Sequence, residues 1–426
     1  MEESSDAIDR PFGTHPPVTI NYVFRGPHHR RRLLISAVFV VACGVLVIGW
    51  GGGDSATAQA LGVPPAPTVT PGAGSLTASW APSSGVPPSS AAEVRTYPRS
   101  VSCAPSGDYS CRLRVDDATP WTVSVRERIG SSWTAWSPRS SPVPHVSIVV
   151  VAGQSNATGW ESEAIDAATG KNLLTQSPSP ADRAIPISWD QPQTTKPARV
   201  GFDDSGPVPL LTPQILDDGQ SSGPQGQQIF GPEVTLARGL YSAGVRDAVI
   251  LKVTKGGTRL GDNGPWSPPS GALYSTLLTD ARDLQTWEAS KGRSATIATI
   301  NWYQGESDST PVLAPSYQRN LTNLITSMRT DLGAQTTTPF VIVKTSIAAY
   351  IDVQQRTGVC SPSQCAALHV ADNEVRAADD AVASKLPAVA LVDSILLPRI
   401  GVLLHLSNHG ELLLGTALVT PNRAGL

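Results

Sequence analysis

Charged residues are scarce in this sequence, and so are clusters of basic residues. Asp, Glu, Lys and Arg make up 16% of the 426 residues, and the formal net charge is −3. Basic clusters are rare outside the N-terminal stretch 25–32. A protein that binds nucleic acid needs a basic face to contact the phosphates. We therefore exclude nucleic acid as a partner.

Cysteine is also scarce, and the spacing of the five cysteines is informative. Cys43 lies within an apolar run, whereas the other four form two close pairs, Cys103 with Cys111 and Cys360 with Cys365. Such pairing is typical of disulfides formed in an oxidising compartment, and the alternative is four free thiols. Neither pair has further His or Cys at the spacing of a zinc site, so we expect no metal.

Residues 33–50 form an apolar run without charge, and arginines directly precede it. A transmembrane helix needs about 20 apolar residues, and positive charge is retained on the cytoplasmic side. The pattern predicts a cytoplasmic tail at 1–32, a transmembrane helix or signal anchor at 33–50, and a Gly-, Ala- and Pro-rich linker at 51–63. The membrane would then be a partner through this N-terminal helix.

The alternative for this region is a cleaved signal peptide, with Ala58-Gln59-Ala60 as the small-residue cleavage site. Both interpretations export the rest of the chain, which agrees with the paired cysteines. The predicted localisation is a single-pass membrane protein with its main domain outside the cytoplasm, or a secreted protein if the chain is cleaved after Ala60.

Residues 64–143 predict a small all-β sandwich. Short alternating segments are separated by Pro, Ser and Gly clusters, and they lie at 76–80, 93–97, 110–115 and 121–126. Further features follow in order along the segment, and they are the Pro-x-x-Pro opening, Trp80, Tyr97, the cysteine pair and Ser132-Trp-Thr-Ala-Trp-Ser137. With these features in this order, the segment resembles a fibronectin type III domain. Such modules act as spacers or as protein and glycan contacts.

From residue 145 to 426 the pattern changes to buried strands alternating with helices. Apolar, β-branched runs predict five strands, at 146–152, 248–253, 295–301, 340–343 and 388–392. Helical stretches lie between or after them, at 232–243, 273–289, 316–330, 366–383 and 411–418. This alternation predicts an α/β domain with a mainly parallel sheet, in which ligands bind at the carboxyl ends of the strands.

Polar residues that could take part in catalysis follow three of these strands and precede the last helix. Ser155, in Gly153-Gln-Ser-Asn156, stands at a strand-to-helix turn that suits an exposed nucleophile, although a helix N-cap is the alternative. Lys255-Gly-Gly-Thr258 lets backbone N–H groups approach a substrate oxygen. The segment Gln304-Gly-Glu-Ser-Asp308 carries an amide and two carboxylates, and His405 stands at the start of the last helix.

Together these four ordered blocks resemble the SGNH hydrolase superfamily, and more closely its sialate O-acetylesterase-like, carbohydrate acetylesterase branch, over about 145–420. The resemblance implies a flavodoxin-like three-layer sandwich with a five-stranded, mainly parallel sheet. It also implies an esterase that needs no metal or organic cofactor and acts on an acetylated carbohydrate. The residue roles that it implies are a nucleophile, Ser155; a base, His405, in preference to His409; oxyanion donors, the N–H groups of Ser155 and Gly256 and the side chain of Gln304; and substrate contacts, Asn156, Gly257 and Thr258.

One position departs from the family pattern. The family usually has an aspartate three residues before the histidine, and here that position is Val402. An imidazole base needs a carboxylate or a carbonyl to fix its tautomer. The sequence offers Glu306 first, Asp308 second and Asp393 third, with a backbone carbonyl as a further alternative.

The substrate and the competence of the site stay open at this level. Five aromatic residues are candidates for stacking on a sugar, although buried packing explains each equally well: Trp160, Trp189, Phe202, Phe230 and Trp266. Val402 supports the alternative of a catalytically impaired fold that acts as a glycan-binding or adhesion module. A lipase- or thioesterase-like activity would require an apolar lid, which the sequence does not indicate.

Overall fold

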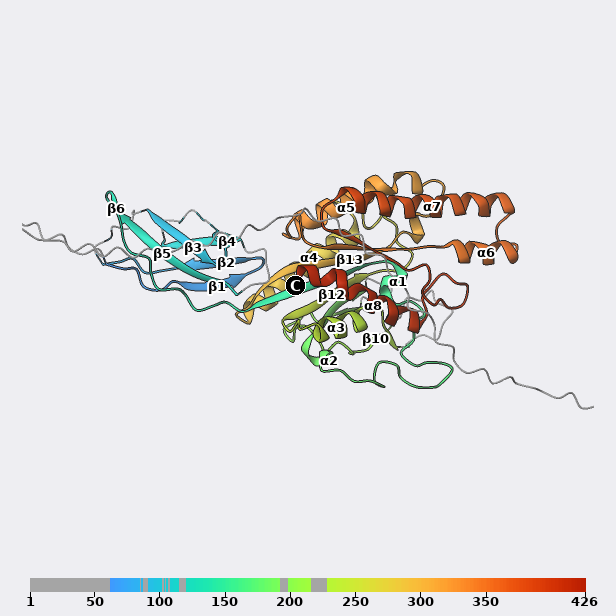
Figure 1. The fold of residues 1–426 in the computed structure, drawn as a ribbon, viewed down its shortest axis with the longest axis horizontal. Coiled ribbons are helices and arrows are strands. Elements are labelled where there is room, and N and C mark those ends of the chain that lie inside the picture. The colour runs from blue at the N-terminus through green and yellow to red at the C-terminus, as the bar shows by residue number, and fades with distance from the viewer. Residues whose placement is uncertain are drawn as a thin grey trace, which may run out of the picture.

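The structure is a computed structural model, and it describes residues 62–426 except for 85, 87–90, 102, 104, 106–107, 115–119, 192–197 and 216–227. A smaller all-β part and a larger α/β part lie end to end (Figure 1). The predicted tail at 1–32, the helix at 33–50 and the cleavage site at Ala58–Ala60 lie outside the described residues.

The all-β part consists of two three-stranded antiparallel sheets. One has the order β1-β2-β4, with bounds Thr68–Gly72, Ser75–Ser79 and Ser110–Arg114; the other has the order β3-β5-β6, with bounds Ala92–Tyr97, Thr122–Ile129 and Ser132–Trp133. Side chains from both sheets form one core around Trp121 and Leu113. The strands lie where the alternating segments predict them, whereas the resemblance to a fibronectin type III domain stays a prediction.

Both predicted disulfides are confirmed. Cys103 bonds to Cys111 at the start of β4, and Cys360 bonds to Cys365 in the first turn of α7. The second bond links the end of the α6 segment to α7, so that the two helices form a hairpin that extends from the α/β part (Figure 1).

The central sheet of the α/β part has seven strands, in the order β15-β14-β13-β7-β12-β8-β9. Neighbouring strands pair in parallel except for β8 and β9, which pair antiparallel. The strand bounds are β7 His145–Gly153, β8 Ile187–Gln191, β9 Ala198–Val200, β12 Ala248–Thr254, β13 Ser294–Tyr303, β14 Phe340–Lys344 and β15 Val389–Asp393, and a separate hairpin pairs β10 Gln214–Ile215 with β11 Gln228–Ile229.

The prediction of a five-stranded sheet is therefore wrong, because the sheet is mixed and larger. All five expected strands are present, but β8 and β9 extend the sheet at one edge. Strand β8 was missed because its sequence, Ile-Ser-Trp-Asp-Gln, has no apolar run, although all five residues are buried. Strand β9 has only three residues, too few to show a period.

Helices cover both faces of the sheet and leave its carboxyl edge to the loops. Helices α4, α5 and α7 pack on one face, and α3 and α8 pack on the other (Figure 1). The helix bounds are α1 Ser155–Thr158, α2 Ala181–Ala184, α3 Glu233–Ser242, α4 Ala272–Ser290, α5 Ala314–Asp331, α6 Ala348–Arg356, α7 Pro362–Lys385 and α8 Asn408–Asn422, with 3-10 helices η1 Glu306–Asp308 and η2 Arg423–Gly425. Three layers result, as the resemblance implies.

The expectation of a membrane-spanning helix also requires correction. Within the part of the chain that the structure describes, every helix is too short or too polar to cross a bilayer. The membrane partner and the single-pass localisation therefore have no support among the described residues.

The edge strand β9 is held to the layer of helices by a cluster of ionisable groups. Arg199 of β9 forms ion pairs with Asp280 and Asp283 of α4, and Asp190 of β8 lies beside them. Burial, together with repulsion from Asp190, raises the pKa of Asp280 to about 7. The folded chain therefore favours the neutral carboxyl of Asp280 below about pH 7.

We expect this cluster to make stability depend on pH. Because the folded pKa of Asp280 lies above its unfolded value, the stabilising contribution is complete below about pH 4. It is lost as the pH rises through about 7. Asp280→Asn should gain stability relative to the wild type between pH 5 and pH 8, measured by urea unfolding. A constant difference between the two proteins would contradict the assignment.

Candidate active site

The first turn of the site is formed where β7 ends and α1 begins. A Cβ on Gly153 would lie 2.0 Å from the carbonyl oxygen of Tyr303, so only glycine lets β7 and β13 approach this closely before the turn. Ser155 follows as the first residue of α1, a helix of a single turn that ends at Gly159 in the left-handed conformation. Ser155 is thus placed at the carboxyl edge of the sheet.

The histidine reaches the serine from the opposite end of the domain. His405 lies on the loop between β15 and α8, and its Nε2 is 3.1 Å from Ser155 Oγ. Ser407 caps α8 by accepting a hydrogen bond from the N–H of Gly410, which fixes where the loop ends. Residues 155 and 405, which sequence analysis predicted to act together, are therefore within hydrogen-bond distance. His409 instead contacts Asp166, at 3.3 Å, and does not face Ser155.

Asn156 holds the loop of His405 against the turn that carries Ser155. Its Oδ1 accepts a hydrogen bond from the N–H of Leu406, and its Nδ2 donates to Glu306 and, at 3.4 Å, to the carbonyl of Leu404. The two backbone groups flank His405. Asn156 is fully buried, so it positions the loop rather than contacting a substrate as we predicted.

A carboxylate that is not among the three predicted from the sequence contacts the imidazole. Glu161 Oε2 lies 3.0 Å from His405 Nδ1, on the side of the ring opposite Ser155. The hydrogen bond from His405 lowers the pKa of Glu161, and partial burial offsets this only in part. A carboxylate can only accept, so the facing Nδ1 carries the proton and Nε2 is free to accept from the serine hydroxyl.

Glu161 occupies this place through an unusual backbone conformation. Its φ is +64°, which in a residue other than glycine costs about 1–2 kcal/mol. Strain of this kind is typical of functional sites. The signal that could have revealed Glu161 is Gly159, which ends α1 after one turn and returns the chain to the serine.

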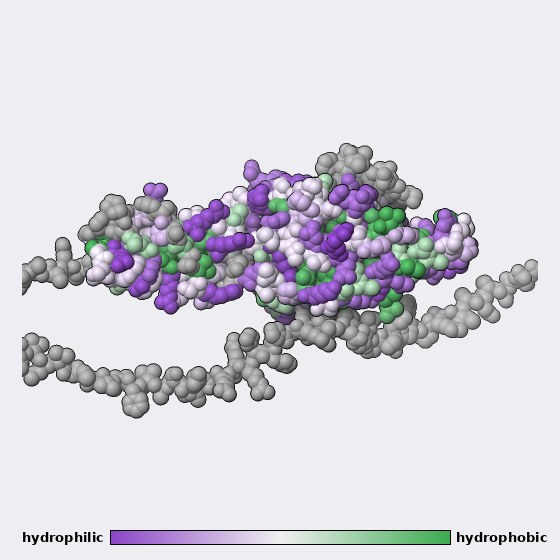
Figure 2. All heavy atoms as spheres, turned by 90° about the horizontal axis from the view of Figure 1, so that it is seen from above, coloured by the Kyte–Doolittle hydropathy of each residue, from purple (hydrophilic) through white to green (hydrophobic). Residues whose placement is uncertain are grey.

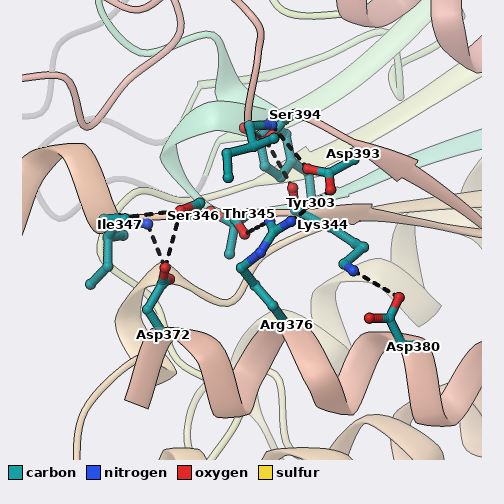
Figure 3. Close-up of polar contacts among 12 residues, drawn as sticks. Tyr303, Lys344, Thr345, Ser346, Ile347, Asp372, Arg376, Asp380, Asp393 and Ser394 are labelled. Carbon is teal, nitrogen blue, oxygen red and sulfur yellow. Dashed lines mark hydrogen bonds and ion pairs between the residues drawn. The ribbon is translucent and has the colours of Figure 1, made fainter. Parts of the chain in front are cut away.

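None of the three carboxylates proposed from the sequence contacts His405. Glu306 accepts from Asn156, and Asp308 accepts from the N–H groups of Leu260 and Gly261. Asp393 forms an ion pair with Arg376 of α7, as Figure 3 shows. The prediction that one of them orients the base is therefore corrected. Glu306 and Asp308 instead brace the loops around the site.

Two backbone N–H groups form a candidate anion site beside the serine. A Cβ on Gly256 would lie 3.6 Å from Ser155 Cβ and 3.2 Å from the ring of Trp160, so Gly256 borders the serine directly. Neither the N–H of Ser155 nor that of Gly256 has an acceptor in the described part of the chain. Their role as oxyanion donors stays a prediction.

The third predicted donor, Gln304, lies differently. Its Nε2 donates to Asp308 at 2.6 Å, and it also lies 3.2 Å from Gln154 Oε1 and from the carbonyl of Thr258. The side chain is fully buried. The structure thus gives Gln304 the role of joining three loops, with no N–H left over for an oxyanion.

The remaining candidates for substrate contacts fall into two groups, residues at the surface near the site and residues buried in the core. Trp160 lies beside His405, with ring centroids 6.2 Å apart, and is half-buried. Gly257 is exposed, and a Cβ on it would meet nothing within 4 Å, whereas Thr258 accepts from Trp266 and donates to the carbonyl of Lys255. The other four aromatic residues that we considered lie in the core or, for Phe202, under Arg199.

The loop that carries His405 is apolar on its outer side. Four of its side chains are exposed at 41–81%, and these are Ile395, Leu396, Ile400 and Val402. Figure 2 shows that apolar surface on the face in view occurs in separate patches with hydrophilic surface between them. Val402 is thus partly exposed to solvent, and it is Glu161 that contacts His405 Nδ1.

Comparison with known proteins identifies the family. The family model for carbohydrate esterase, sialic acid-specific acetylesterase, matches residues 145–421, which is more than half of the chain. The chain belongs to this family, and the resemblance inferred from its sequence blocks is confirmed. No curated protein matches the chain.

Several solved structures are similar to the chain. A protein from Arabidopsis thaliana is 22% identical, covering 66% of this chain and 99% of its own, with a TM-score of 0.42. A carbohydrate acetylesterase from Xanthomonas citri is 15% identical over 84% and 75%, with a TM-score of 0.40. NanS is 15% identical over 66% and 97%, with a TM-score of 0.44.

We expect Asn156 to be essential for positioning the histidine. Asn156→Ala leaves the buried N–H of Leu406 and the carboxylate of Glu306 without a partner, which costs about 1–3 kcal/mol of stability. It should also lower kcat for an acetyl ester more than it raises KM, because the loop that carries His405 is no longer held in place. Steady-state kinetics and urea unfolding check both effects. Unchanged kcat in a destabilised variant would contradict a positioning role.

Proposed function

We propose that the chain is a serine esterase that hydrolyses O-acetyl esters on carbohydrate through an acyl-enzyme. The observation that carries the proposal is the unbroken series of contacts from Glu161 through His405 to Ser155, with distances of 3.0 and 3.1 Å. It lies at the carboxyl edge of the sheet, where ligands bind in α/β folds. Membership of a carbohydrate esterase family supports the substrate class.

In the first half of the reaction, Ser155 Oγ attacks the acetyl carbonyl carbon while His405 Nε2 takes its proton. The N–H groups of Ser155 and Gly256 donate to the oxyanion, and removing such a donor costs about 2.7–4 kcal/mol of barrier stabilisation. The tetrahedral species collapses as the C–O bond to the sugar breaks. His405 returns the proton to the leaving sugar oxygen.

In the second half, water attacks the acetyl group on Ser155, and His405 acts as base and acid again. Acetate leaves and the serine hydroxyl is restored. Throughout, Glu161 accepts from Nδ1–H and stabilises the imidazolium that forms in each step. This carboxylate supports an active site despite Val402, and it therefore favours the esterase over a catalytically impaired fold.

The serine and histidine assignments have a matched internal control. Ser155→Ala and His405→Ala should each lower kcat for 4-nitrophenyl acetate by at least about 10³-fold, because nucleophile and base act as a unit. His409→Ala removes a nearby exposed histidine whose imidazole pairs with Asp166, and it should retain wild-type rates. Wild-type turnover by Ser155→Ala would end the proposal.

The role of Glu161 is tested separately from fold stability. Glu161→Gln keeps the size of the side chain but removes the charge that stabilises the imidazolium, so we expect kcat to fall by about 10²–10⁴-fold. Glu161→Asp should recover part of the rate. The control is Asp393→Asn, which removes a carboxylate paired with Arg376 and should leave kcat unchanged. If the two amide variants behave alike, Glu161 does not orient the base.

A further inference from the structure

An alternating series of arginines and aromatic rings covers the outer face of the β3-β5-β6 sheet. Each neighbouring guanidinium lies 3.7–6.0 Å from the centroid of the next ring. In spatial order, the seven members of this arginine ladder are Arg128, Trp133, Arg126, Trp136, Arg95, Tyr97 and Arg139.

A three-residue repeat in the sequence builds one side of the ladder. Thr134, Ser137 and Ser140 each donate a backbone N–H to a carbonyl of β5 and accept, through the hydroxyl, from an N–H of β5. The residue before each of them is turned outward, and these residues are Trp133, Trp136 and Arg139. The repeat therefore sets the rings and the last arginine at regular intervals along the sheet edge.

Strand pairing supplies the other side of the ladder. Glu93 is opposite Arg126 in the β3–β5 register, and Arg95 and Tyr97 follow on the same face. Their neighbours Val94, Val123 and Val125 point into the core, so the ladder residues point to solvent. The face is thus assembled from three segments, none of which is a basic cluster by itself.

The ladder leaves hydrogen-bond donors available. Stacking uses the flat face of a guanidinium, and the N–H groups on its edge stay free for a carboxylate. Arg126 pairs with Glu93, whereas Arg95 and Arg139 have no acceptor for these groups in the described part of the chain. Among the residues that the structure describes, one carboxylate thus faces four guanidiniums, so this part of the surface has an excess of positive charge although the chain as a whole carries −3.

We infer that the arginine ladder is a docking surface for an acidic polysaccharide, which holds the esterase on a polymeric, uronate-type substrate. Charge complementarity indicates an anionic occupant. The rings are covered by guanidiniums on their faces, so recognition is through repeated guanidinium–carboxylate contacts and not through stacking on sugars. The choice of a glycan rests on the proposed function of the α/β part.

Binding by the ladder is measured on the full-length chain with Ser155→Ala, so that the polymer is not turned over. Affinity electrophoresis in gels that contain polygalacturonate gives the dissociation constant, and dextran is the neutral comparison. We expect retention by polygalacturonate only, with Arg95→Gln/Arg139→Gln weakening it about tenfold because each exposed ion pair contributes a few-fold. Arg112→Gln removes the same charge from the other sheet and should bind like the parent.

The outcomes separate this inference from the proposed function. Arg95→Gln/Arg139→Gln, with Ser155 intact, should hydrolyse 4-nitrophenyl acetate at the wild-type rate, so that a failure of catalysis and a failure of docking appear in different assays. Equal binding by the ladder variant and Arg112→Gln would overturn the inference. So would tighter binding to duplex DNA or to anionic lipid vesicles than to polygalacturonate.

If the double variant unfolds, as judged by near-ultraviolet circular dichroism, the parent protein still provides a test. Ion pairing at an exposed surface is screened by salt, so raising NaCl from 50 to 500 mM should release the polymer, and galacturonate oligomers should compete for it. Retention that is insensitive to both would also overturn the inference.

Discussion

The site depends on one contact, between the hydroxyl of residue 155 and the imidazole of residue 405, which come from opposite ends of the α/β part. The contact exists because a parallel sheet brings the carboxyl ends of its strands to one edge. Proximity at an edge does not by itself give hydrogen-bond geometry. That geometry comes from Asn156, whose side-chain amide holds the backbone on both sides of His405. A buried amide with partners on two loops is costly to disrupt, which makes the contact durable.

The carboxylate of the site shows that a role can be kept while its position in the chain changes. The family pattern places it three residues before the histidine, where this chain has Val402. The structure has a carboxylate at the same ring nitrogen, but it comes from Glu161, six residues after the serine. What the imidazole requires is a negative acceptor at Nδ1, and either loop can deliver one. Because Glu161 supplies the acceptor at Nδ1, the valine at position 402 does not change the tautomer of His405.

The two parts of the chain differ in how they present charge. In the α/β part, Glu306 and Asp308 beside the site are buried and hydrogen-bonded, and they brace loops, as with Asp308 and the amide of Gln304. In the all-β part, guanidiniums stack on aromatic rings at the surface. Stacking lowers the entropy that an arginine loses on binding, because its planar group is already ordered. Such preorganisation suits a surface that meets a repeating ligand.

The amino-acid sequence by itself determined the family, both disulfides, five strands of the sheet and the pairing of residue 155 with residue 405, because these depend on local periodicity and on short ordered blocks. It did not reveal β8 and β9, the role of Glu161 or the arginine ladder. Strand β8 is buried although its sequence has no apolar run. Glu161 reaches His405 from a backbone conformation with positive φ, and the ladder combines residues from three separate segments. Tertiary structure decided these features, since each depends on contacts between segments that no local pattern in the chain records.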